Sequence, residues 1–248
     1  MGKDVLGLDA KIGVLVPATN TIVQPEFEQM RPAGVSNHTA RVVLGSNPAD
    51  YMTNYRETVR LNDINTKLAL DTLLPCEPDI LAIGHSHDSF EGGLEGAREY
   101  EEKHVLMSGL PTVVPSLAMV AALEALGRPK RLAILTPYTP EGDEMTAAFF
   151  DDVGYTVVSI VGLHIKVATA IAELTRHDVT EWVRSMDSSK VDAHIQVGTN
   201  LAMASFAPAL VNELKKPVLT INTATYWNTL NRLGLKTGSS ELFGCLAS

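Results

Sequence analysis

Short runs of apolar, mostly β-branched residues alternate along the chain with longer amphipathic stretches. The apolar runs are continuous, which is typical of strands that helices cover on both faces of a parallel sheet. One amphipathic stretch predicts a helix over Leu117–Leu126 that Ser116 caps. The predicted strands are Lys11–Val16, Ala40–Leu44, Asp79–Ile83, Thr112–Val114, Arg131–Leu135, Tyr155–Val161, Val191–Val197 and Val218–Ile221.

Three strand-and-loop units occur twice in the same order, which indicates a duplication. The pattern predicts an α/β fold with two pseudo-symmetric, open parallel-sheet (Rossmann-like) halves. We expect residues 1–114 plus about 223–248, a returning C-terminal helix, to form the N-terminal half, and 115–222 to form the second. The matching segments are Lys11–Thr19 with Lys130–Thr139, Pro78–Ser86 with Lys190–Asn200, and Leu110–Ser116 with Lys216–Asn222.

The duplication also predicts where the active site lies. Ligands of open α/β sheets bind beyond the carboxyl ends of the strands, so two facing halves surround one cleft with their loops. The loops hold most of the unusual polar residues of the chain, which favours a functional cleft. They are Pro17–Thr21, Gly84–Gly93, Thr136–Pro140 and Gly198–Asn200.

Composition narrows the class of protein. Of the 248 residues, 45% are hydrophobic and 20% charged, as in ordinary globular chains, and no apolar run approaches membrane-spanning length. The net charge is −9 with no basic run longer than Lys215–Lys216, so we expect neither a nucleic-acid nor a membrane partner. The absence of a secretory signal, together with two cysteines without CxxC spacing, predicts a cytoplasmic protein. Without a Walker or G-x-G-x-x-G motif, no nucleotide cofactor is expected.

Four segments together carry a family resemblance that covers nearly the whole chain. Gly13–Thr21 resembles the opening strand and loop of maleate isomerases, and Thr136–Thr139 their second-half loop with its tyrosine. Lys216–Trp227 resembles their closing strand and helix, and Gly84–Gly93 resembles the corresponding loop of arylmalonate decarboxylases. The chain therefore resembles the aspartate/glutamate racemase superfamily, nearest to its maleate isomerase and arylmalonate decarboxylase branch. The resemblance implies an enzyme without a cofactor and permits a homo-oligomer.

The chain departs from this pattern at the residue that carries the chemistry. In the superfamily, one or two cysteines at the ends of the equivalent central strands act as proton donor, base or nucleophile. Gly84 or His85 and Gly198 or Thr199 occupy those places here. Cys76 precedes its strand and Cys245 is near the terminus, so no thiol chemistry carries over.

The loop after the third predicted strand offers a replacement. Its His85-Ser86-His87-Asp88 sequence combines two groups that titrate near neutral pH with a carboxylate that can orient one of them. We interpret His85, His87 and Asp88 as catalytic, although a histidine that only hydrogen-bonds the loop backbone is the structural alternative. Tyr138, in the matching loop of the second half, is the fourth catalytic candidate, as a donor to an oxyanion.

Short polar side chains around the same point suit a substrate carboxylate. Turn capping is the alternative role for such residues. The substrate-binding candidates are Thr19, Asn20, Ser86, His164, Thr199 and Asn200.

The first interpretation is a cofactor-independent isomerase or lyase that acts on a small carboxylate or carbonyl compound by histidine-based proton transfer. A second is a hydrolase or lyase with a divalent metal such as zinc, held by His85, His87, Asp88 and His164. A third is a catalytically silent protein that binds small molecules. Bound anion without turnover would distinguish the third.

Overall fold

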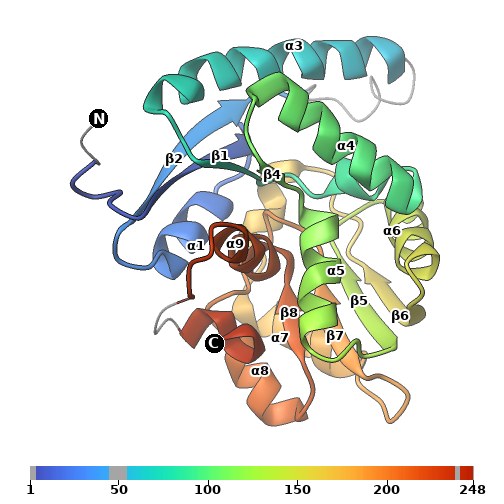
Figure 1. Cartoon of the computed structure of the whole chain (residues 1–248). Helices are drawn as coiled ribbons and strands as arrows, with labels where there is room; N and C mark the ends of the chain where they lie inside the picture. Colours follow the sequence, from blue (N-terminus) through green and yellow to red (C-terminus); the bar gives the residue numbers. More distant parts are fainter. Residues whose placement is uncertain (1–3, 45–54, 238–240, 248) are drawn as a thin grey trace.

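Two four-stranded parallel sheets form the framework of the computed structural model, which describes residues 4–44, 55–237 and 241–247 (Figure 1). The strand order is β2-β1-β3-β4 in the first sheet and β6-β5-β7-β8 in the second, so corresponding strands hold corresponding places. This confirms the predicted α/β class. The strands are β1 (Ala10–Pro17), β2 (Val35–Val42), β3 (Ile80–Ile83), β4 (Thr112–Val113), β5 (Arg131–Thr136), β6 (Thr156–Gly162), β7 (Ala193–Gln196) and β8 (Val218–Thr220).

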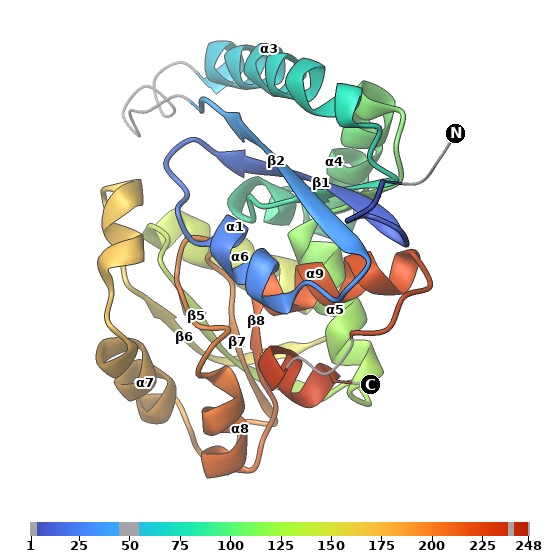
Figure 2. The ribbon, with the colours of Figure 1, turned by 90° about the vertical axis from the view of Figure 1, so that its left-hand side faces the viewer.

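The helices form layers on both faces of each sheet, as Figures 1 and 2 show. Helices α3 (Tyr55–Leu73) and α4 (Gly93–Ser108) cover the outer side of the first sheet, and α7 (Arg176–Ser185) and α8 (Ala207–Leu214) that of the second. Between the sheets lie α1 (Val23–Met30), α5 (Pro115–Ala125) and α9 (Ile221–Arg232), while α6 (Pro140–Asp152) follows β5. The 3₁₀ turns are η1 (Leu74–Cys76), η2 (His87–Phe90), η3 (Ala168–Glu173) and η4 (Glu241–Leu246). In the described ranges, no helix combines the length and apolarity that crossing a membrane demands.

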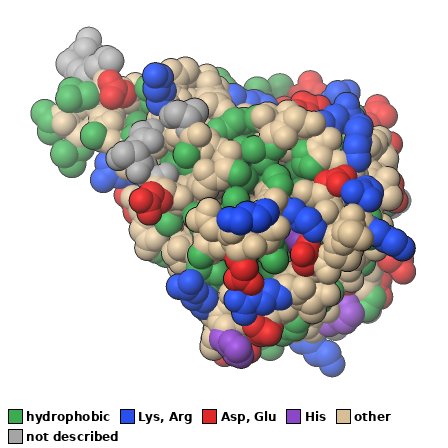
Figure 3. Space-filling view, turned by 90° about the horizontal axis from the view of Figure 1, so that it is seen from below, with side chains coloured by type: hydrophobic (Ala, Val, Ile, Leu, Met, Phe, Trp, Pro, Cys, Tyr) green, Lys and Arg blue, Asp and Glu red, His purple; other side chains and the backbone are tan. Residues whose placement is uncertain are grey.

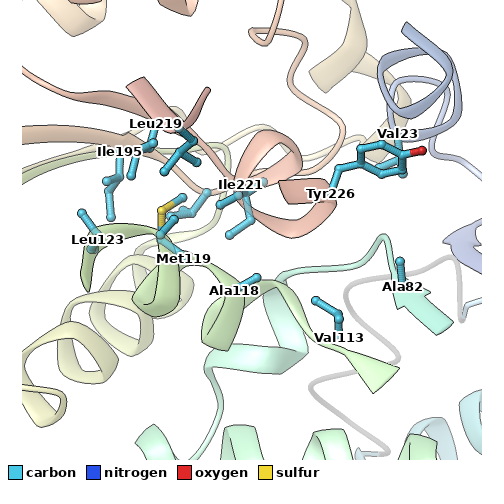
Figure 4. Packing of buried hydrophobic residues seen from close by; sticks show 14 of the residues in the cluster. Val23, Ala82, Val113, Ala118, Met119, Leu123, Ile195, Leu219, Ile221 and Tyr226 are labelled. Atoms are coloured by element: carbon cyan, nitrogen blue, oxygen red, sulfur yellow. The ribbon is translucent and has the colours of Figure 1, made fainter. Parts of the chain in front are cut away.

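The largest apolar cluster lies between the two sheets and joins them. Val14 and Val16 of β1 face this cluster, whereas Leu15 between them packs toward α3, as the alternation of a strand requires. Figure 4 shows Met119 of α5 beside Ile195 of β7, and α5 is one of the helices that fill the space between the two sheets. The sheets are therefore packed into one body, with their carboxyl ends on the same side. Where the boundary between the halves falls along the chain stays a prediction.

Two local predictions differ from the structure. The strand expected at Ala40–Leu44 is β2, which begins at Val35 and ends at Val42. As the edge strand of its sheet it is only partly buried, so polar residues interrupt the apolar pattern. Ser116 does not cap α5 but lies inside its first turn, where its hydroxyl donates to the Ser89 carbonyl oxygen at 2.5 Å.

Candidate active site

The ends of β3 and β7 leave no room for a side chain at the glycines that follow them. A Cβ added at Gly84 would lie 2.8 Å from Cγ1 of Val16 and 3.1 Å from the Leu15 carbonyl oxygen. One added at Gly198 would lie 2.6 Å from Cδ of Pro137. Real Cβ contacts are longer, so a cysteine at either place would displace the surrounding backbone or ring. A cysteine side chain at Gly84 or Gly198 therefore does not fit the observed arrangement.

The histidine loop directly after β3 brings its two imidazoles onto one carboxylate. His87 Nδ1 lies 3.2 Å from Oδ1 of Asp88, and His85 Nδ1 lies 3.5 Å from Oδ2 of the same residue. Because a carboxylate only accepts, Nδ1–H of His87 is the donor, and in the neutral form of the ring Nε2 carries the lone pair. Asp88 thus orients His87 with its free nitrogen turned away from the carboxylate. The catalytic role expected for this pair stays a prediction.

Electrostatics keep the Asp88 carboxylate charged and favour the neutral form of His85. Burial raises the pKa of Asp88, but the His85 and His87 rings and Lys103 more than offset this and hold it at about 2. Burial lowers the pKa of His85 below its ordinary 6.5, and the attraction of Asp88 offsets this only in part. A fixed negative charge therefore stands beside both rings at neutral pH and stabilises an imidazolium when one forms.

Tyr138 links this loop to the second half of the molecule. Its ring meets that of His87 edge to face, with ring centroids 5.0 Å apart. The phenol donates to the Val197 carbonyl oxygen at 2.8 Å and lies 2.7 Å from Oγ of Ser86, which is therefore the donor of that second bond. Burial raises the pKa of Tyr138 above its ordinary value, and the nearby carboxylates of Asp88 and Asp143 raise it further. The phenol stays protonated and acts only as a hydrogen-bond donor at neutral pH.

The predicted ring of substrate-binding donors is assembled, but its members bond one another across the halves. Asn20 Nδ2 donates to Oγ1 of Thr199 at 3.2 Å, while its Oδ1 accepts the backbone amides that open α1. Asn200 Oδ1 accepts from the Thr21 amide at 2.9 Å, and its Nδ2 donates to Ala168. The turn-capping role considered for Asn20 is thus present, whereas its role in substrate binding stays a prediction. The loops meet as expected, in a closed arrangement.

The sequence analysis did not identify two residues whose hydrogen bonds also join the loops of the two halves. Glu26 of α1 is buried; its Oε1 accepts the amides of Met203 and Ala204, and its Oε2 accepts from Asn222 Nδ2 at 2.7 Å. Asn222 also donates to the Thr199 carbonyl oxygen. Burial raises the pKa of Glu26 in spite of these bonds. The signal was an acid at helical spacing among the apolar residues of α1, a position that normally faces the core.

The proposed four-residue metal set is not brought together. His164 Nε2 lies 2.8 Å from Oδ2 of Asp143, a residue of α6 that also accepts from Thr136, so His164 has a partner of its own. Within residues 4–44, 55–237 and 241–247, no three histidine, cysteine or acidic side chains are arranged to hold a metal ion. Thr19 is exposed in the turn after β1. These two substrate-binding candidates, Thr19 and His164, lie outside the hydrogen-bonded junction.

An open pocket reaches the histidine loop from the first half alone. It has a volume of about 180 Å³ and lies between the carboxyl ends of β1 and β3 and the helices α3 and α4. His85 and Asp88 form part of its wall, whereas Tyr138 and Thr199 do not. This pocket lies beside the first sheet, and the active site expected in a cleft between the halves stays a prediction.

Two facing parallel sheets, with polar loops joined at their carboxyl ends and a partly exposed His-Asp pair among them, define a two-half α/β enzyme with a racemase-like fold. The chain belongs to the arylmalonate decarboxylase family, whose model matches residues 12–243. Members of this kind are isomerase and lyase enzymes, and this chain is an enzyme of that type.

Relatives and solved structures agree with this assignment over nearly the full length. A maleate isomerase of Pseudomonas putida is 24% identical over 234 residues, which cover 91% of this chain and 92% of the relative. The Nocardia farcinica maleate cis-trans isomerase bound to Tris superposes with a TM-score of 0.81 at 21% identity, covering 95% of this chain and 98% of that one. Arylmalonate decarboxylase superposes with a TM-score of 0.72 at 20% identity, over 94% and 98% of the two chains. One structure of the Nocardia enzyme holds a covalently bound succinylcysteine intermediate.

Proposed function

We propose that the protein is a cofactor-independent isomerase or lyase for a small carboxylate, with His87 as the proton-transfer residue. The observation that carries the proposal is the Asp88–His87–Tyr138 arrangement directly after β3. It provides an oriented imidazole and a phenol donor at the edge of the sheet where superfamily members place a thiol. Gly84 and Gly198 leave that thiol no space.

Decarboxylation is the reaction that needs least beyond these groups. When the bond between the leaving carboxylate and the α carbon breaks, its electron pair passes into the remaining carboxylate as an enediolate. The hydroxyl of Tyr138, which now donates to the Val197 carbonyl oxygen, turns to donate a hydrogen bond to that developing oxyanion. Protonated His87 gives its Nε2 proton to the carbon. Asp88 stabilises the imidazolium before this transfer. An isomerisation that moves a proton at the same carbon uses the same groups, so it stays the alternative.

The substrate carboxylate would accept hydrogen bonds from side chains that now bond one another between the two halves. If the anion replaces the Asn20–Thr199 and Ser86–Tyr138 bonds, four polar side chains from the two halves become able to hydrogen-bond it. Productive binding therefore requires the loops to separate by about the size of a carboxylate. A homo-oligomer, usual among such enzymes, stays a prediction that light scattering of the purified protein tests.

The test is turnover of a phenylmalonate and of maleate by chelator-treated protein in D₂O, followed by proton NMR. We expect one solvent deuterium at the carbon that receives the proton. His87→Gln keeps a polar side chain of similar length and should lower turnover on the order of 10²-fold or more. His177→Gln, at an exposed site on α7, is the matched control and should leave turnover unchanged.

Full activity of His87→Gln would remove that residue from the mechanism. Loss of activity on chelation, restored by zinc, would replace the cofactor-independent proposal with a metal-assisted one. Tight binding of the carboxylates without any product would favour a silent binding protein.

A further inference from the structure

Glu26, in the first turn of α1, is an acid in an unusual environment. On the face of the molecule that Figure 3 shows, acidic side chains lie at the surface beside lysine and arginine side chains. Glu26 is instead only 7% exposed, and within the described ranges no lysine or arginine pairs with it. A buried carboxylate is stable only when hydrogen bonds or a cation compensate for its lost hydration, so its partners indicate its role.

Three N–H groups from segments that follow strands of the second sheet donate to this carboxylate. Two are the backbone amides of Met203 and Ala204, 3.0 and 2.9 Å from Oε1. The third is Nδ2 of Asn222, 2.7 Å from Oε2. The same nitrogen lies 2.9 Å from the Thr199 carbonyl oxygen, which can only accept, so the orientation of the Asn222 amide is defined. Because all three neighbours donate, the arrangement fits the ionised form of Glu26.

These bonds complete a closed ring of contacts that includes two of the substrate-binding candidates. From Glu26, α1 leads back by one turn to its first amides, which donate to Oδ1 of Asn20. Nδ2 of Asn20 donates to Oγ1 of Thr199, and the Thr199 carbonyl oxygen leads through Asn222 back to Glu26. Asn20 and Thr199 are therefore each held by contacts other than the bond that they make to one another.

The matching position in the second half is also a buried acid, but its partners differ. Glu26 is the fourth residue of α1, which follows β1, and Asp143 is the fourth residue of α6, which follows β5. Asp143 accepts from Thr136 and lies 2.8 Å from Nε2 of His164, so it is bonded within its own half. Glu26 instead joins a helix beside the first sheet to loops of the second. The contrast indicates that Glu26 serves the junction between the halves.

We propose that Glu26 is a positioning residue for the substrate carboxylate. It holds the backbone of Thr199 through Asn222, and it holds Asn20 through the first turn of α1. When a carboxylate displaces the Asn20–Thr199 bond, this link keeps the two side chains close enough to donate to one anion. The inference rests on the proposed function, since it takes Asn20 and Thr199 as the groups that bind the substrate. Glu26 itself takes no part in proton transfer.

Calorimetric titration of the full chain at pH 7.5 and 25 °C tests this role with succinate and phenylacetate. Both are small carboxylates that lack the reactive group of maleate or phenylmalonate, so binding is measured without turnover. Glu26→Gln keeps an acceptor for the two backbone amides but places an NH₂ group opposite Nδ2 of Asn222, which breaks the link at one bond. We expect Kd to rise on the order of tenfold, the effect of about one buried hydrogen bond.

Asn222→Ala removes the same link from its other end and should weaken binding at least as much. In the double variant Glu26→Gln, Asn222→Ala, the two losses should not add, because both substitutions break one link. Additive losses would contradict a shared link between Glu26 and Thr199.

Two control variants separate positioning from charge and from stability. Glu28→Gln removes an equal charge from an exposed site on α1 and should leave Kd unchanged. Tyr226→Phe removes a buried hydrogen bond one turn beyond Asn222 on α9. It should lower Tm, as Glu26→Gln does, but leave Kd unchanged in the folded protein.

The combination of Kd and Tm decides between the outcomes. Weaker binding by Glu26→Gln, with Kd unchanged in both controls, supports the positioning role. If Glu26→Gln lowers Tm but binds both carboxylates as tightly as the unaltered chain, Glu26 is merely structural and the inference is overturned. An equal effect of Glu28→Gln on Kd would overturn it as well, because net charge would then account for the loss. If the unaltered chain binds neither carboxylate, the carboxylate site of the proposed function fails, and this role fails with it.

Discussion

Replacing Tyr138 by phenylalanine removes one hydroxyl that joins the two halves, from a ring that contacts the proposed proton-transfer residue His87. The ring and its contact with His87 are kept, so the change isolates the hydrogen bonds. If the phenol stabilises an oxyanion, its loss costs about 3 kcal/mol of barrier height, or about 10²-fold in turnover. The phenol stays protonated through the neutral range, because burial raises its pKa, so this loss should be the same from pH 6 to pH 9.

The same hydroxyl also contributes to stability. Tyr138→Phe leaves the Val197 carbonyl oxygen without the donor now 2.8 Å away, which costs about 1–2 kcal/mol of unfolding free energy. For a chain of this size, that corresponds to a fall in Tm of about 2–8 °C. Turnover and stability should therefore both decrease, by amounts that calorimetry and steady-state kinetics measure separately.

A second buried tyrosine provides the control. Tyr226 of α9 donates to Oδ1 of Asn37 at 2.9 Å, away from the junction of the loops. Tyr226→Phe should lower Tm by a similar amount and leave kcat within about twofold, because it removes a comparable hydrogen bond without touching the site. If the two variants lose stability and turnover alike, Tyr138 has only a structural role and our reasoning about its phenol is wrong.

Further predictions concern the carboxylate, the cysteines and the strand-end glycine. Asp88→Asn should lower kcat on the order of 10²-fold or more, since the amide favours the wrong histidine tautomer; kinetics near those of the parent would exclude an orienting role. Because the pKa of Asp88 is about 2, its ionised form stabilises the fold at neutral pH, and this contribution is lost as pH falls from about 4 to about 2. Burial lowers the pKa of His85, so the folded protein should lose stability as pH falls below about 6.5. Measuring Tm against pH checks both effects, and Asp88→Asn should lack the loss of stability between about pH 4 and pH 2. The double variant Cys76→Ala, Cys245→Ala should keep near-normal turnover, and complete inactivation with the fold intact would reinstate thiol chemistry. Gly198→Cys should lower the free energy of unfolding by about 1–3 kcal/mol through overlap with the facing proline ring, and an unchanged Tm would show that the loop yields easily.

Local pattern was sufficient to predict the architecture of this protein. Continuous β-branched runs, repeated in the same order, predict two parallel sheets, and the polar residues after those runs predict the edge at which they gather. The prediction was least accurate at β2, because an edge strand is buried on one side only and its sequence is correspondingly mixed. Burial of both faces leaves a clear pattern, whereas partial burial does not.

Sequence proximity also identified the histidine loop. His87 and Asp88 are neighbours along the chain, so their contact follows from a single 3₁₀ turn. The relation of that pair to Tyr138 depended on the predicted duplication, which placed two distant loops at one point. The roles of these residues in turnover stay predictions.

Only the tertiary structure decided which polar groups have partners. Asn20 and Thr199 are 179 positions apart, yet they bond each other, which leaves the predicted donor ring closed. His164 was expected as a metal ligand, but in the fold it pairs with Asp143. Glu26 accepts from the amide of Met203, 177 positions away, a partner that its neighbours in the sequence do not indicate. Hydrogen bonds of this kind form only when segments far apart in the chain are placed to within a few tenths of an ångström. The hydrophobic periodicity of the sequence predicts the direction in which a side chain points, but not the group that it contacts.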